Sequence, residues 1–275
     1  MIDRMMPYLP AAIAVLLVVA FYSFAIAPYD LEVTENNFSL FDGHGAPLKA
    51  VLISDTETTY DYPNYLDGAV ALVNAQQPDI VFLAGDYVEL DDGAWEKLGP
   101  LGNIRAKYGV YAVLGNHDYR EWGCSRANAS YADKVAAKLE SMGITVLRND
   151  YRIIDAAGHR VAIVGIDDYW ACRNDFRKAE QGISPAVPQI ILAHNPVAFY
   201  GEELPAGALL LSGHTHCGQV RLPMVTDAIT RVLGLGDTVG GRAKLGQHDM
   251  YITCGVIPGG VRFLTRPEIS VLYVD

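Results

Sequence analysis

The sequence lacks three features that would each point to a particular class of protein. It has no run of lysines and arginines, no Cys-x-x-Cys pair, and no repeated or low-complexity tract. Its 21 basic and 32 acidic side chains give a formal net charge of −11. A sequence-independent nucleic-acid binder needs cations to neutralise phosphates, so this composition argues against that function. A phosphorylated ligand would have to be attracted by something other than bulk charge.

Charged residues are also absent between Met5 and Tyr29. An apolar run of about 20 residues can span a bilayer, whereas the apolar core of a cleaved signal peptide is usually about 7–15 residues long. We therefore expect residues 1–29 to form an uncleaved transmembrane anchor. A cleaved signal peptide is the alternative, because Ala-Ile-Ala before Pro28 resembles a cleavage site, although the proline should hinder cleavage.

The charges around this run predict its orientation. Arg4 precedes the run, Asp30 and Glu32 follow it, and the next cation is Lys49. By the positive-inside rule, the N-terminus then lies in the cytoplasm. We expect a single-pass protein of the inner (cell) membrane, with one periplasmic or extracytoplasmic domain formed by residues 30–275.

The four cysteines are Cys124, Cys172, Cys217 and Cys254, which allow three complete pairings. Cys124 and Cys172 both lie in polar loops after expected strands, so a disulfide between them fits an oxidising compartment. Four free thiols that pack as small apolar side chains are the alternative.

Apolar, β-branched runs recur after residue 45 and alternate with helix-like stretches at 65–76 and 131–143. The runs are nearly continuous, which is typical of strands buried on both faces. They lie at 48–55, 79–86, 109–118, 159–168, 189–196, 208–216, 250–256 and 269–275, with a shorter alternating strand at 31–40. This alternation predicts an α/β fold with layered sheets. The Gly-rich segment 222–247 is expected to be a long loop with one short helix.

Six of these runs end in residues capable of chemistry. Taken singly, each residue could be a turn or a helix cap, but ligand sites in α/β sheets gather at the carboxyl ends of strands. The residues are Asp55, Asp86, Asn116-His117-Asp118, Asp167-Asp168, His194-Asn195 and His214-Thr215-His216. We therefore expect them to converge on one site.

These residue types favour a metal site. Oxygen and imidazole ligands without thiolates suit Mn, Fe, Zn or Mg rather than a structural zinc site. So many ligands predict two divalent ions joined by a bridging carboxylate, which is the usual arrangement for phosphoryl chemistry. Two such ions would also attract a phosphate to an acidic protein.

The ordered blocks SDTE, AGD, GNHD, LAHNP and SGHTH resemble those of the calcineurin-like metallophosphoesterases, from about residue 48 to the end. The continuation GHTHCGQVRLP and the ending RPEISVLYV look like the membrane-anchored bacterial branch of that superfamily. The resemblance implies a four-layer αββα sandwich, in which two mixed β-sheets are flanked by helices. It also implies a dinuclear site at the strand ends.

The family's ligands can be placed on this sequence by position. The first ion would be bound by Asp55, residue 57, Asp86 and His216. The second ion would be bound by Asp86 as the bridge, together with Asn116, His194 and His214. A bridging hydroxide would attack phosphorus, and His117 would stabilise or protonate the leaving group. Asp118 could orient His117; a solvated carboxylate is the alternative.

The sequence departs from the family pattern at residue 57, where a histidine is expected and Glu57 stands. Glu57 could bind the first ion through a carboxylate oxygen, could point away and leave that ion weakly held, or could mark a chain without activity. We favour ligation, because glutamate is a common ligand of hard ions and the other ligands of the pattern are present. Manganese is then the favoured metal.

Two loops, residues 119–130 and 168–178, could select the substrate. Arg120, Arg126 and Arg173 lie in these loops and could each bind a phosphate, although exposure to solvent is the ordinary fate of a single arginine. The predicted function is hydrolysis of a phosphomonoester or phosphodiester, lipid-linked esters included. One alternative is a lipid A enzyme of the UDP-diacylglucosamine pyrophosphatase type, which would need a cytoplasmic site. The other is a catalytically silent module that binds phosphorylated ligands.

Overall fold

Two six-stranded mixed sheets form the centre of the molecule, within the residues that the computed structural model describes: 8–41, 45–58, 64–89, 93–120, 123–222, 224–232 and 239–275. The strand orders are β1-β12-β2-β3-β4-β5 and β10-β11-β9-β8-β7-β6. The first sheet contains β1 (Glu32–Phe38), β2 (Leu48–Ile53), β3 (Ile80–Leu83), β4 (Val110–Ala112), β5 (Thr145–Val146) and β12 (Glu268–Val274). The second contains β6 (Asp150–Ala156), β7 (His159–Ile166), β8 (Gln189–Ala193), β9 (Leu209–Ser212), β10 (Gly241–Leu245) and β11 (His248–Ile252).

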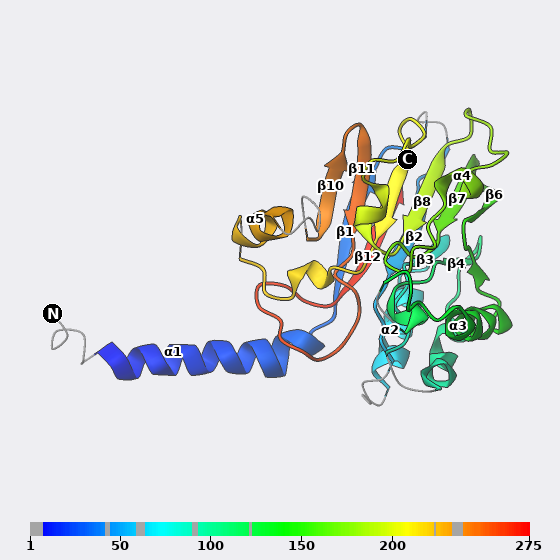
Figure 1. Ribbon diagram of the computed structural model, residues 1–275. Coiled ribbons are helices and arrows are strands. Elements are labelled where there is room, and N and C mark those ends of the chain that lie inside the picture. The colour runs from blue at the N-terminus through cyan, green and yellow to red at the C-terminus, as the bar shows by residue number, and fades with distance from the viewer. Residues whose placement is uncertain are drawn as a thin grey trace.

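Helices cover the outer faces of both sheets (Figure 1). The α-helices are α1 (Leu9–Phe21), α2 (Tyr65–Ala75), α3 (Ala129–Ser141), α4 (Phe176–Ala179) and α5 (Val225–Val232). One buried cluster joins the inner faces of the two sheets, for example Phe82 with Ile190. A second cluster joins the first sheet to α2 and α3, and a third joins the second sheet to α4. The predicted four-layer sandwich is therefore confirmed.

The strand pairing explains why chemistry gathers at one edge of each sheet. The strands β2, β3 and β4 are parallel neighbours, and so are β7, β8, β9 and β11. Parallel neighbours bring their carboxyl ends to the same edge. All eight long apolar runs of the sequence form strands, as does the alternating segment 31–40.

Parts of both sheets differ from the sequence prediction. The segment 222–247 contains the expected short helix, α5, but also the strand β10, which pairs antiparallel with β11. Its residues alternate between half-buried and exposed positions, as in an edge strand. The strands β5 and β6 were also not predicted. Both lie at sheet edges, where a strand is buried less and its apolar pattern is weaker.

The helix α1 projects away from the two sheets, and none of its residues is buried (Figure 1). Together with the following turns it forms one helical segment, Leu9–Tyr29, that is long and apolar enough to cross a membrane. The end of this segment is fixed to the domain. The carbonyl oxygen of Ser23 accepts a hydrogen bond from the backbone N–H of Arg262 at 2.9 Å, and the Arg266 guanidinium contacts Asp30 at 2.7 Å.

Candidate metal centre

A first group of possible metal ligands contains Asp55, Glu57 and His216, whose ligand atoms all lie within 4.8 Å of one another, and Glu57 also forms such a group with Glu89 and His117. The His216 Nε2 atom is 3.3 Å from Glu57 Oε1 and 3.7 Å from Asp55 Oδ1. Asp55 and Glu57 follow β2 with positive φ angles of 53° and 36°. This turn brings both carboxylates to the carboxyl end of the strand. Both side chains are buried.

The second group contains Asp86, His194 and His214, from the ends of β3, β8 and β9. The His194 Nε2 atom is 3.0 Å from Asp86 Oδ2 and 3.1 Å from His214 Nδ1. The other ring nitrogen of His194, Nδ1, donates to the carbonyl oxygen of Ala84 at 2.7 Å. A carbonyl can only accept, so this bond fixes the tautomer and turns Nε2 toward the site.

Burial and neighbouring charge shift the protonation of both groups. Burial disfavours the His194 cation, but Asp86 outweighs burial and raises the His194 pKa to about 10. Burial and the adjacent His194 lower the pKa of His214 to about 3. Burial raises the pKa of Glu57, against the opposing effect of His216. In the metal-free protein, the carboxylates and imidazoles of the site therefore share protons with one another.

Asn116 offers a test of whether this donor set fits a metal. Its side chain is buried, and neither its amide oxygen nor its amide nitrogen has a hydrogen-bond partner among the described residues. An orphaned buried amide is costly unless another partner satisfies it. Two carboxylate-imidazole groups beside an available amide oxygen are the donor set expected for divalent ions such as Mn, Fe, Zn or Mg. The residues present therefore fit such a centre.

A glycine gives Asp86 the space that it occupies. A Cβ atom on Gly115 would lie 2.1 Å from Asp86 Oδ1, so a side chain there would displace the carboxylate. The same carboxylate oxygen accepts the backbone N–H of His117 at 2.9 Å. The Gly-Asn-His-Asp block thus positions Asp86 as well as contributing its own side chains.

His117 lies beside these groups, with its side chain partly exposed. Its Nδ1 is 3.4 Å from Glu89 Oε2, and its Nε2 is 3.9 Å from Asp86 Oδ2. Burial disfavours the imidazolium, but Glu89 and Asp86 outweigh burial and raise the His117 pKa to about 10. Sequence reasoning missed Glu89, which lies in no block of the family pattern. A three-residue spacing from Asp86 is the only available signal, and it is a weak one.

Asp118 does not take either of the positions expected from the sequence. It is fully buried, and its carboxylate accepts the backbone N–H groups of Asp86 (3.0 Å), Tyr87 (2.9 Å) and Gly115 (2.8 Å). Asp118 therefore ties the turn after β3 to the turn after β4. Glu89, rather than Asp118, is the carboxylate beside the imidazole of His117.

A cavity of about 320 Å³ opens over the two groups. Apolar side chains form much of its wall, including Trp170, Val197 and Val239, and Thr230 of α5 also lines it. The Trp170 ring meets His214 edge to face, with the ring centroids 4.4 Å apart. The wall can therefore accept an apolar part of a ligand next to the polar groups.

The three arginines predicted to bind substrate are not among the residues that line this cavity. The Arg120 guanidinium lies over the Tyr131 ring, 5.3 Å from its centroid. Arg126 and Arg173 are exposed. Their role in substrate binding stays a prediction.

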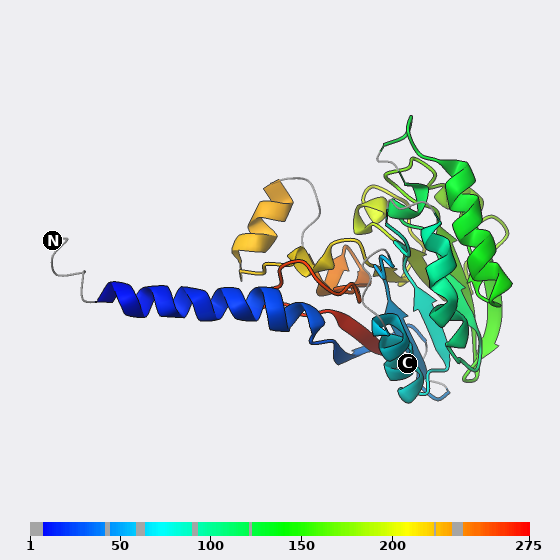
Figure 2. The same cartoon turned by 90° about the horizontal axis from the view of Figure 1, so that it is seen from below.

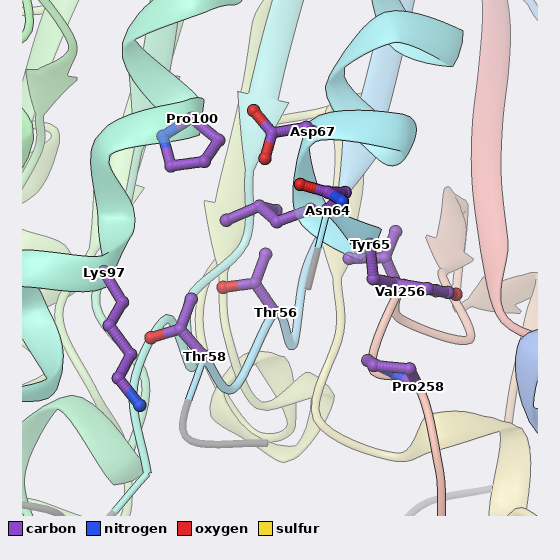
Figure 3. Close-up of a pocket in the computed structure, with 10 residues that line it drawn as sticks. Thr56, Thr58, Asn64, Tyr65, Asp67, Lys97, Pro100, Val256 and Pro258 are labelled. Atoms are coloured by element: carbon purple, nitrogen blue, oxygen red, sulfur yellow. The ribbon is translucent and has the colours of Figure 1, made fainter. Parts of the chain in front are cut away.

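A second cavity, of about 240 Å³, lies beside the turn that carries Asp55 and Glu57 (Figure 3). Thr56, between the two carboxylates, lines it together with Thr58, and Figure 3 shows Lys97 on the side of Thr58, across from Pro258. None of the predicted metal ligands lines this cavity. The turn after β2 thus separates the metal groups from a polar cavity.

Arg262 is a further residue that the sequence did not reveal. Its side chain is fully buried, and its guanidinium donates to the carbonyl oxygens of His216 and Cys254, each at 3.2 Å. Since its backbone N–H also binds Ser23, Arg262 connects the end of the apolar helix to a candidate metal ligand. Burial lowers the pKa of Arg262, against the opposing effect of Asp55 and Glu57.

Two disulfides join the four cysteines, Cys124 to Cys172 and Cys217 to Cys254. The first is the bridge considered from the sequence, and the alternative of four free thiols is not what the structure contains. The second holds together the residue after His216 and the loop that follows β11. It therefore braces the first metal group.

Comparisons with known proteins agree with this geometry. The profile of the calcineurin-like phosphoesterase family matches residues 48–218. The phosphodiesterase YaeI of Escherichia coli (strain K12) is 30% identical over 88% of this chain and 87% of its own length. The uncharacterized metallophosphoesterase YkuE of Bacillus subtilis (strain 168) is 29% identical over 91% of this chain and 87% of its own length. The transmembrane protein with metallophosphoesterase domain of Bos taurus is 33% identical over 63% of this chain and 41% of its own length.

Proposed function

The chain belongs to the calcineurin-like phosphoesterase family and is a hydrolase of phosphoester bonds, and from this premise we propose that it cleaves phosphomonoesters or phosphodiesters at a dinuclear metal centre. One observation supports the centre above all. Two groups of carboxylate and imidazole atoms, each within 4.8 Å, contain six of the seven ligands predicted from the sequence. Asn116, the seventh, lies buried with its amide unpaired.

We assign the ligands as follows. The first ion would be held by Asp55, Glu57 and His216, and the second by Asn116, His194 and His214, with Asp86 as a ligand of both. Two divalent ions supply charge that neutralises a phosphate and acidifies water. We propose that both ions are manganese, because the first group is rich in carboxylate oxygen and therefore suits a hard ion.

The residues around the ligands perform the remaining tasks. Burial disfavours the His117 imidazolium, but in the metal-free protein Glu89 and Asp86 raise its pKa to about 10, and the protonated ring can donate its proton to a departing alkoxide. Glu89 keeps that imidazole protonated and oriented. The apolar wall around Trp170 holds the organic part of the ester and limits access of water.

The disulfides support an extracytoplasmic location for this site. Both bridges lie in the domain that follows the apolar helix, and such bridges persist in oxidising compartments. We therefore propose that residues 1–29 anchor the chain in the inner (cell) membrane and that residues 30–275 form the periplasmic or extracytoplasmic domain. This location disfavours the cytoplasmic lipid A reaction.

Turnover of p-nitrophenyl phosphate and of bis(p-nitrophenyl) phosphate tests the proposal, with Mn, Mg, Zn and Fe supplied separately to the chelated full-length protein. We expect turnover of at least one ester with Mn, and none with chelator alone. Absence of turnover with every metal, together with unchanged ligand binding in His117→Ala, would instead identify a silent binding module.

A further inference from the structure

The helix α5 has the reverse of the polarity expected for a helix on the surface of a soluble domain. Such a helix normally packs its apolar side on the core and turns its polar side to water. Met224, just before α5, is 84% exposed and Val232 is 86% exposed. Val225 and Ile229 are also exposed, and none of the residues of α5 is buried.

These side chains form one face. Their spacing, with Ala228, is i, i+1, i+4, i+5 and i+8, which places them on the same side of a helix. We call them the apolar face of α5: Met224, Val225, Ala228, Ile229 and Val232.

The opposite side of α5 faces the domain. Thr226 is half-buried, and its methyl group would be only 2.9 Å from a Cβ atom on Gly218. Its hydroxyl also accepts the backbone N–H of Leu222 at 2.8 Å. Thr230, one turn later, lines the cavity over the metal groups. One side of α5 therefore borders that cavity, and the opposite side carries the exposed apolar face.

The position of α5 indicates what covers this face. In both views α5 lies at the level of the C-terminal half of α1, on the side of the domain from which α1 projects, and Figure 1 shows a gap between the two helices (Figures 1 and 2). The contacts of Ser23 with Arg262 and of Asp30 with Arg266 fix the end of the apolar segment to the same domain. A bilayer that surrounds α1 would therefore reach α5.

We propose that the apolar face of α5 inserts into the bilayer leaflet next to α1, as an interfacial helix, and that this contact places the metal centre at the membrane surface. Leu222 (43% exposed) precedes α5, and Leu264 (58% exposed) lies two residues after Arg262, which binds the end of the apolar segment. A substrate class follows from this contact, and it rests on the proposed function. It is an amphiphilic phosphate ester whose chains stay in the bilayer while its head group enters the cavity beside Trp170 and Thr230.

Fluorescence quenching tests the membrane contact without any dependence on catalysis. The full-length protein is reconstituted in phosphatidylcholine vesicles with brominated acyl chains, carrying Val232→Trp or the control Leu72→Trp, and the wild-type signal is subtracted. Leu72 is an exposed apolar residue of α2 (39%), away from the anchor. We expect quenching of the tryptophan at 232 and little at 72. Equal quenching at both positions, or no quenching at 232, would overturn the proposal. No quenching at 232 is the result expected if a second copy of the chain covers this face.

A matched pair of diesters tests the substrate class. Hexadecyl p-nitrophenyl phosphate in the vesicles and soluble methyl p-nitrophenyl phosphate present the same reacting group. The double variant Ile229→Asp/Val232→Asp should lower turnover of the hexadecyl ester about tenfold or more and change turnover of the methyl ester less than about twofold. Leu72→Asp should change neither. An equal effect on both esters would refute the substrate class. If the wild type hydrolyses no ester, alkyl phosphates included, the proposed function fails, while the quenching result still decides the membrane contact.

Discussion

As a ligand, Glu57 would change the charge of the first metal group. With histidine at this position, two carboxylates and one hydroxide against two divalent ions give a formal charge of about +1, and Glu57 reduces it to about 0. A more neutral centre acidifies its water less and attracts a phosphate less. Since Glu57 is buried 3.3 Å from His216, its carboxylate lies where it can exert this effect.

We therefore predict that Glu57→Ala loses about one of the two ions per chain and that its rate falls about 100-fold. Glu57→His should keep both ions and shift the pH dependence of turnover to lower pH. Elemental analysis of dialysed protein and pH–rate profiles measure both effects. If the alanine variant retains two ions and the full rate, Glu57 is not a ligand.

His117 and Glu89 form a pair whose roles can be separated. His117→Ala should lower kcat about 10²–10⁴-fold with unchanged metal content, because the leaving group loses its proton donor. Glu89→Gln removes a charge that raises the His117 pKa, which is about 10 in the metal-free protein. An acid acts only below its pKa, so the alkaline limb of the pH–rate profile should move to lower pH. An unmoved limb would assign Glu89 a purely structural role.

At the scale of helices and strands, the sequence predicted those elements whose burial imposes a strong pattern. The central strands are continuous apolar runs that end in chemical residues, so both the sheets and the convergence of Asp55 with His216 could be predicted. The strand β10 could not, because it has only five residues, none of them buried, and lies in a segment rich in glycine. Arg262 and Glu89 act through folded geometry, which no local spacing encodes.

The disulfide between Cys217 and Cys254 closes a segment of chain with a sequence separation of 37. Replacing both cysteines with serine should lower the free energy of unfolding by about 3–4 kcal/mol, because the unfolded chain regains the entropy of an open loop. It should also weaken the first metal group, since Cys217 follows His216. The matched control is the Cys124–Cys172 pair, with a separation of 48. Its removal should cost similar stability and spare metal affinity, as measured by denaturant unfolding and metal titration.

At the scale of the whole molecule, an acidic chain with a net charge of −11 attracts an anionic substrate only where cations concentrate. The fold brings the candidate ligands that follow β2, β3, β8 and β9, strands of two different sheets, to one place. Each group is incomplete if the sheets separate. Metal binding should therefore be coupled to the packing of the sandwich as well as to protons.

The proton coupling gives a prediction with a definite sign. In the metal-free protein His194 has a pKa of about 10, above its ordinary value of 6.5, so it carries a proton at neutral pH. Between these values the folded chain holds this proton and the unfolded chain does not, so the contribution of His194 to stability is lost as pH rises. A metal must displace the same proton, so metal affinity should instead rise with pH, about tenfold per unit for each proton released. Titration of Mn into the chelated protein in weak buffer at pH 7.5 should release protons, whereas His194→Gln should release fewer. Binding without proton release, or affinity that is constant between pH 6.5 and 8.5, would refute the assignment of His194 as a ligand.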